Sequence, residues 1–121
     1  MQWRPVEVGI DLVSPSRVAR AQARGVFAMV CHSDEPHQTW SADTAARVWS
    51  AKEAVVKTLG PGFWQGGLDF QDIVISTEDW SVNLHRRAFE LAQGDKFVIE
   101  FREFDGCIMT TALRFKITAQ S

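Results

Sequence analysis

The chain has 121 residues, 45% of them hydrophobic and 23% charged, which is the composition of a globular domain and not of a disordered segment. Its formal charge of −2 gives no overall attraction for nucleic acid or for an anionic membrane, so we expect neither as a partner. No targeting signal and no run of about 18 apolar residues is found, which indicates a cytoplasmic protein that is not exported. No repeat or linker divides the sequence, so we predict one domain over residues 1–121. Two cysteines without a zinc or disulfide pattern, Cys31 and Cys107, are expected to be reduced thiols.

An alternating segment opens the chain. From Val6 to Leu12 every second residue is apolar, which predicts a strand with one buried apolar face and a more open face that carries Asp11. The following segment predicts a helix over residues 16–24, which begins at a serine N-cap and ends at Gly25.

The middle of the chain predicts a loop, a long helix and shorter elements. Residues 31–40 are polar and contain a proline, which is typical of a loop. Ser41 has the properties of an N-cap for a helix over 42–59. A strand is predicted over 70–76 and a short helix over 86–92.

A hairpin is predicted at the end of the chain. Two apolar-rich runs, 97–104 and 107–117, flank the dipeptide Asp105-Gly106, which is a strong signal for a two-residue turn. The order of helices and strands predicts an α+β fold with an antiparallel sheet packed against the long helix.

The long helix carries a lysine within its apolar stripe. At about 100° per residue, the stripe contains Ala45, Val48, Trp49, Val55, Val56 and Leu59. Lys52 falls near the centre of this stripe and Glu53 at its edge, with Lys57 one turn further on. Lys52 either extends its ammonium to water along the apolar surface or is buried against a carboxylate or a ligand phosphate. Glu53 and Lys57 could form a simple surface pair.

Two carboxylates are candidates for a metal site, namely Asp11 on the first strand and Glu53 on the long helix. If the helix packs across that strand, the pair could hold one divalent cation, with water and a substrate phosphate as further ligands. Such carboxylates usually only face solvent, so their spacing leaves both interpretations open.

Other residue clusters carry weaker signals. The glycines after the long helix match no known phosphate loop and are explained by a helix end and a turn; they are Gly60, Gly62, Gly66 and Gly67. Along one side of the predicted first helix lie three arginines, Arg17, Arg20 and Arg24. They form either a solvated face or a docking site for an acidic partner. The scattered histidines give no support to nucleophilic catalysis.

Two motifs together resemble those of the 4′-phosphopantetheinyl transferases, and within them the small holo-acyl-carrier-protein synthase type. A strand reading G-[IV]-D-[IL]-V, followed by an early helix arginine, is matched by Gly9-Ile10-Asp11-Leu12-Val13 and Arg17. An aromatic residue, then K-E-[AS], a lysine and L-G-x-G are matched by Trp49, Lys52-Glu53-Ala54, Lys57 and Leu59-Gly60-Pro61-Gly62. The family's F-x-D-I strand is similar to Phe70-Gln71-Asp72-Ile73. The resemblance covers roughly residues 6 to 92.

The resemblance implies Mg²⁺-dependent transfer of the phosphopantetheine arm of coenzyme A to a serine of an apo acyl carrier protein, of fatty-acid or polyketide type. Asp11 and Glu53 would bind the metal, with Glu53 also acting as the base and Lys57 stabilising phosphate charge. Lys52, Lys57, Gly60 and Gly62 would contact the coenzyme, and Arg17, Arg20 and Arg24 would dock the carrier. The resemblance also implies a homotrimer with the active site between subunits.

One family feature is missing, because no histidine follows His85 where the family has a Ser-His segment that contributes to coenzyme binding. An alternative is therefore a catalytically degenerate module of the same fold that binds a carrier protein or coenzyme A. A small scaffold domain without a ligand would explain the apolar content, but not the coincidence of the two motifs.

Overall fold

The computed structural model describes residues 2–60 and 68–118 of the chain. The strands are β1 (Gln2–Val13), β2 (Ile73–Ile75), β3 (Val82–Leu84), β4 (Lys96–Phe104) and β5 (Cys107–Thr118). The α-helices are α1 (Pro15–Ala23), α2 (Ala42–Thr58) and α3 (Arg86–Ala92), and short 3₁₀ helices occupy Phe27–Val30, His37–Thr39 and Phe70–Asp72. The predicted α+β fold is confirmed.

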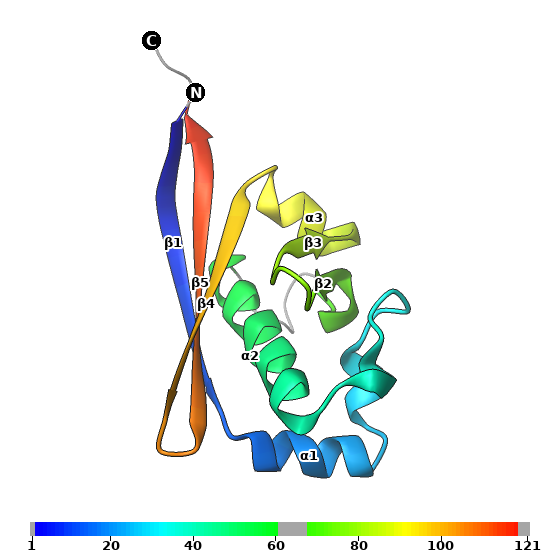
Figure 1. Cartoon of the computed structure of the whole chain (residues 1–121). Coiled ribbons are helices and arrows are strands. Elements are labelled where there is room, and N and C mark those ends of the chain that lie inside the picture. The colour runs from blue at the N-terminus through cyan, green and yellow to red at the C-terminus, as the bar shows by residue number, and fades with distance from the viewer. Residues whose placement is uncertain (1, 61–67, 119–121) are drawn as a thin grey trace.

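The elements form layers around α2 (Figure 1). A three-stranded antiparallel sheet of order β1-β5-β4 packs on one side of α2, and a two-stranded sheet of β2 and β3 lies with α3 on the other. The helix α1 packs against α2 and lies across the end where α2 begins. The long helix is therefore enclosed by most of the remaining structure.

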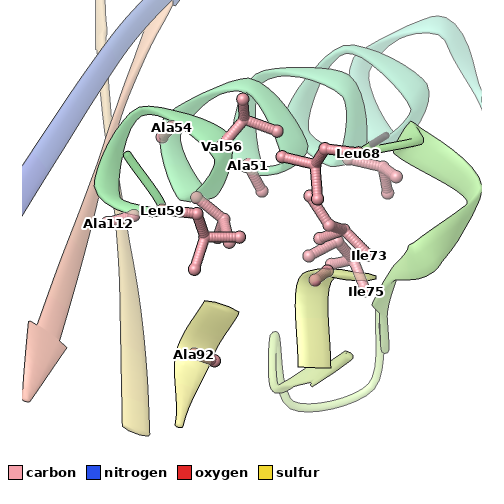
Figure 2. Packing of buried hydrophobic residues seen from close by; sticks show 12 residues of the cluster. Ala51, Ala54, Val56, Leu59, Leu68, Ile73, Ile75, Ala92 and Ala112 are labelled. Atoms are coloured by element: carbon pink, nitrogen blue, oxygen red, sulfur yellow. The ribbon is translucent and has the colours of Figure 1, made fainter. Parts of the chain in front are cut away.

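Small side chains on α2 allow this close packing (Figure 2). Ala51 and Ala54 are fully buried and belong to the same cluster as Ile73 and Ile75 of the small sheet and Ala112 of β5. A second cluster of buried residues fills the space beneath α1; it contains Val13, Val18, Phe27, Cys31, Ala45, Ala46 and Ile108. The first cluster fixes α2 between the two sheets.

The first strand turns its apolar face outward, which contradicts the prediction for that face. Four of its apolar side chains, Val6, Val8, Ile10 and Leu12, are 38% to 56% exposed. Gly9 is buried on the opposite face, and the Asp11 side chain on the same face is only 16% exposed. The face with the acid therefore packs on α2, because alternation separates the two faces but does not say which of them is inside.

Local signals predicted most elements correctly. The Ser41 hydroxyl accepts a hydrogen bond from the Thr44 amide at 3.2 Å, so it caps α2 as predicted. The predicted hairpin is confirmed, and Asp105 and Gly106 both have a positive φ, 51° and 72°. The predicted strand 70–76 is shorter, because the Asp69 side chain accepts from the Gln71 amide and starts a 3₁₀ turn before β2.

Candidate active site

The crossing of α2 over β1 depends on Gly9. An added Cβ at this position would lie 2.0 Å from the Ala54 carbonyl oxygen and 3.2 Å from the Cβ of Lys57. Only a residue without a side chain permits this approach of helix and strand. Because the approach occurs two residues before Asp11 and one residue after Glu53, it brings both carboxylates into one pocket.

Lys57 contacts Asp11, and the charges of both residues act on Glu53. The Lys57 ammonium donates to the Ile10 carbonyl at 2.6 Å and lies 3.4 Å from Oδ1 of Asp11. The pKa of Glu53 is raised by burial and then by the negative charge of Asp11, while Lys57 acts in the opposite direction. Lys57 is 47% exposed, so its charge remains accessible to a ligand.

A pocket of about 440 Å³ opens beside this group. Asp11, Glu53 and Arg17 provide its charged side chains, and apolar residues of α1, α2 and the first 3₁₀ helix provide the rest of its wall, among them Val18, Phe27 and Trp49. The pocket therefore combines a strongly polar end with an apolar wall.

The two carboxylates fit a metal ion that takes its remaining ligands from water and a substrate. Within residues 2–60 and 68–118, no group of three histidine, cysteine, aspartate or glutamate side chains is arranged to hold a metal. Burial and then the negative charge of Asp11 raise the pKa of Glu53, and a bound cation would relieve the repulsion between the two carboxylates. Mg²⁺ is commonly held by one or two carboxylates with waters and substrate phosphates. The pair is thus suited to Mg²⁺ in the presence of a phosphorylated substrate.

Lys52 is not available to a coenzyme, which contradicts its predicted role. Its side chain has no exposed surface, and its ammonium donates to Oε1 of Glu35 at 2.6 Å and to the Ile73 carbonyl at 2.7 Å. The carbonyl oxygens of Val30 at 3.0 Å and Phe70 at 3.1 Å are also within reach, so four acceptors share the three N–H groups of the ammonium. Burial lowers the pKa of Lys52, and the neighbouring Glu35 carboxylate counteracts this effect. Lys52 is a structural cation.

Sequence reasoning missed Glu35 altogether. This residue lies in a segment that was predicted as a polar loop, yet its side chain is completely buried. Besides Lys52, its carboxylate accepts from the His32 amide at 2.8 Å and the Ile75 amide at 3.0 Å. A lysine at the centre of an apolar stripe indicated that some counter-charge was needed, but nothing local identified Glu35 as its source.

The predicted glycine and arginine sites lie at opposite ends of α2. Gly60 follows the helix with a φ of +98° and is exposed, whereas Gly62 lies outside the described residues. The three arginines are exposed and line one surface hollow; they are Arg17, Arg20 and Arg24. No ion pair within the described ranges involves any of these arginines, so their positive charge is open to a partner.

In the described part of the chain, no helix has the length and apolar character needed to cross a membrane.

The sequence is similar to one protein superfamily over most of its length. A sequence profile of the 4′-phosphopantetheinyl transferase superfamily matches residues 7–110. A holo-[acyl-carrier-protein] synthase of Verminephrobacter eiseniae (strain EF01-2) is 38% identical over 77 residues, a match that covers 58% of this chain and 58% of that protein. The aligned region thus spans little more than half of the relative.

Solved structures share the fold. The holo-ACP-synthase of Plasmodium yoelii superposes with a TM-score of 0.77 at 20% identity and covers 98% of this chain and 100% of its own. The Helicobacter pylori holo-[acyl-carrier-protein] synthase, solved in complex with coenzyme A, gives a TM-score of 0.70 at 20% identity, with 89% and 99% coverage. At this identity the structural similarity establishes a common architecture.

Proposed function

We propose that this chain, which belongs to the 4′-phosphopantetheinyl transferase superfamily, transfers the phosphopantetheine arm of coenzyme A to a serine of an apo acyl carrier protein. The observation that carries this proposal is that Asp11 and Glu53 line one pocket, while the Lys57 ammonium lies 3.4 Å from Oδ1 of Asp11. Both sequence motifs of the family resemblance contribute to that meeting. The similar proteins named as holo-acyl-carrier-protein synthases support the same reaction.

The reaction needs a base, a means of stabilising phosphate charge and a route for the leaving group. Glu53, directly or through a water, accepts the proton of the carrier serine as its oxygen attacks the β-phosphorus of coenzyme A. The bond from that phosphorus to the bridging oxygen breaks, and adenosine 3′,5′-bisphosphate leaves. The Glu53 carboxylate borders the pocket beside Asp11, which supports its role as the proton acceptor.

The charges around the pocket fit a diphosphate. Mg²⁺ bound by Asp11 and Glu53 would neutralise the diphosphate during the attack. The exposed ammonium of Lys57 stabilises the additional negative charge on the phosphate oxygens. Gly60 has an exposed backbone close to Lys57, and we retain it, together with Gly62, as a proposed contact of the coenzyme.

The carrier is proposed to bind over α1. Arg17 belongs both to the catalytic pocket and to the arginine hollow, so a carrier held by Arg17, Arg20 and Arg24 would present its serine near Glu53. Acidic side chains on the carrier would complement the arginines, and an apolar side chain would fit the pocket wall. Whether the carrier serves fatty-acid or polyketide synthesis does not alter this chemistry.

Self-association is proposed through the outer face of the large sheet. Val8, Ile10 and Leu12 are 49%, 51% and 56% exposed, and Val98 at the other edge of this face is 40% exposed. Such a contiguous apolar surface favours an interface between copies of the chain, and a homotrimer is the form that we propose. Light scattering should give the mass of three chains, and Ile10→Glu should reduce this mass.

We propose a cytoplasmic location, where thiols such as Cys31 stay reduced.

The test of the activity is an intact-mass measurement. The protein is incubated with coenzyme A, Mg²⁺ and an apo carrier, and the carrier should gain the mass of one phosphopantetheine group. A panel of several fatty-acid and polyketide carriers that all remain unmodified would contradict the proposal.

The alternative is a module that binds without turnover, which is favoured by the lack of a histidine after His85. It predicts carrier binding that depends on Arg17, Arg20 and Arg24, with no added mass on the carrier. Replacing the three arginines by alanine should abolish binding in either case, so the mass measurement separates the two functions.

A further inference from the structure

We propose that Glu35, acting through Lys52, is a positioning residue that sets the rotation of α2 and thereby directs Glu53 and Lys57 toward Asp11. The inference rests on the proposed function, because it concerns the same catalytic group. It begins from a buried charge pair that takes no direct part in the transfer of phosphopantetheine. Both side chains of the pair have no exposed surface.

The pair connects α2 to segments on both sides of it in the sequence. The Lys52 ammonium bonds Val30 and Glu35, which precede α2, and Phe70 and Ile73, which follow it. Glu35 in turn accepts from the Ile75 amide of β2. One ammonium therefore holds the middle turn of α2 to the loop before it and to the small sheet after it.

The rotation of a helix decides where successive side chains point. Neighbouring positions are about 100° apart, so fixing the direction of Lys52 fixes Glu53 about 100° away around the axis. Lys57, four residues beyond Glu53, returns to within about 40° of it. Turning the Lys52 stem toward the small sheet therefore places both catalytic groups on the side that faces β1.

The opposite side of α2 cannot supply this control alone. There α2 meets β1 at Gly9, which has no side chain to resist rotation, and through the bond from the 47% exposed Lys57 ammonium to the Ile10 carbonyl. An atom about 6 Å from the helix axis moves by about 1 Å when the helix turns by about 10°. Displacements of that size in catalytic groups can reduce a rate by about a hundredfold. A directional anchor at Lys52 thus has a direct consequence for the reaction.

The test separates positioning from stability with a charge-free pair, Glu35→Gln combined with Lys52→Met. The glutamine retains an acceptor for the Ile75 amide and the methionine retains the volume of the lysine stem. Removing both charges leaves no unpaired ion in the interior, which avoids the largest cost of breaking a buried pair. The matched control is Ala88→Gly in α3, which destabilises a fully buried helical position away from the pocket.

Two readouts are compared. The first is kcat against the KM for the carrier, and the second is the affinity for Mn²⁺, measured by water proton relaxation without substrate. In the charge-free pair we expect a lower melting temperature, because the Val30, Phe70 and Ile73 carbonyls lose their donor. We also expect kcat and Mn²⁺ affinity each to be at least tenfold lower, with the KM for the carrier unchanged. Ala88→Gly should lower the melting temperature and leave both kcat and Mn²⁺ affinity within twofold.

Wild-type kcat and Mn²⁺ affinity in a folded charge-free pair would overturn the inference. If that pair does not fold, Glu35→Asp keeps the charge but shortens the side chain by one methylene group. It is measured below its melting temperature with the same expectation for kcat. A wild type that binds Mn²⁺ but transfers nothing would contradict the proposed function and leave the Mn²⁺ comparison valid. A wild type that binds no Mn²⁺ would contradict a metal site formed by the protein alone, and kcat would then test the inference, with the same tenfold expectation.

Discussion

Replacing Gly9 by alanine adds one methyl group at the crossing of β1 and α2. The new Cβ would lie 2.0 Å from the Ala54 carbonyl oxygen and 3.0 Å from the Ala54 carbonyl carbon. Both are backbone atoms in the middle of α2, so no side chain can rotate to make room. Helix and strand must separate instead.

The size of the effect follows from these distances. A contact of 2.0 Å has to lengthen by about 1 Å or more before the atoms are no longer in steric overlap. Overpacking of this kind costs about 1 to 3 kcal/mol, and we expect the upper end because the obstacle is backbone. The same displacement moves Glu53 and Lys57 away from Asp11, so the rate of transfer should fall by about a hundredfold.

The assay compares Gly9→Ala with Gly94→Ala by urea unfolding and by transfer rate. Gly94 has a φ of +79°, and no atom of the described residues lies within 4 Å of a Cβ built there. Its substitution should cost about 1 kcal/mol through backbone strain, without displacing α2. The reasoning is refuted if the free energy of unfolding of Gly9→Ala lies within about 0.5 kcal/mol of the wild-type value, the usual range of neutral substitutions, and the variant keeps the wild-type transfer rate.

Three further outcomes are expected. Arg114→Met should lower the free energy of unfolding in urea by about 3 kcal/mol, because the buried Asp95 carboxylate loses the guanidinium at 2.7 Å and keeps only the Lys116 ammonium at 3.8 Å. A loss below about 1 kcal/mol would contradict this. Burial raises the pKa of the Cys31 thiol to about 11, so little thiolate is present at pH 8. A disulfide reagent should therefore modify Cys31 only as fast as the chain unfolds, and faster modification would contradict the burial of this thiol. Asp11→Asn should lower the pKa of Glu53, because it removes a repelling negative charge. The pKa is measured by a carbon NMR titration of the metal-free protein, and an unchanged value would exclude the Asp11 charge as a cause.

Features that depend on neighbouring residues could be predicted from the sequence. The cap at Ser41 and the turn at Asp105-Gly106 need only a few adjacent groups, and both are confirmed. The superfamily was identified correctly because its two motifs are short and contiguous. Of the residues assigned to the site, Asp11 and Glu53 share a pocket, which depends on the close crossing at Gly9.

Features that depend on distant contacts could not be predicted. Two partners of Glu35, Lys52 and the Ile75 amide, lie 17 and 40 residues further along the chain. A polar loop gives no signal that one of its acids is buried. The inner face of β1 was also assigned wrongly, because alternation in a strand is satisfied by burial against the chain's own helix or against a second copy. In both cases the missing information is tertiary.

The most direct test of the central claim is the transfer reaction followed by intact mass for the wild type and for Glu53→Gln, side by side at equal folded fraction. The wild type should add one phosphopantetheine group to an apo carrier, dependent on Mg²⁺ and coenzyme A. Glu53→Gln should remain folded and lose most of this rate, by about a hundredfold or more. Transfer by Glu53→Gln at the wild-type rate would contradict the role of Glu53 as metal ligand and base.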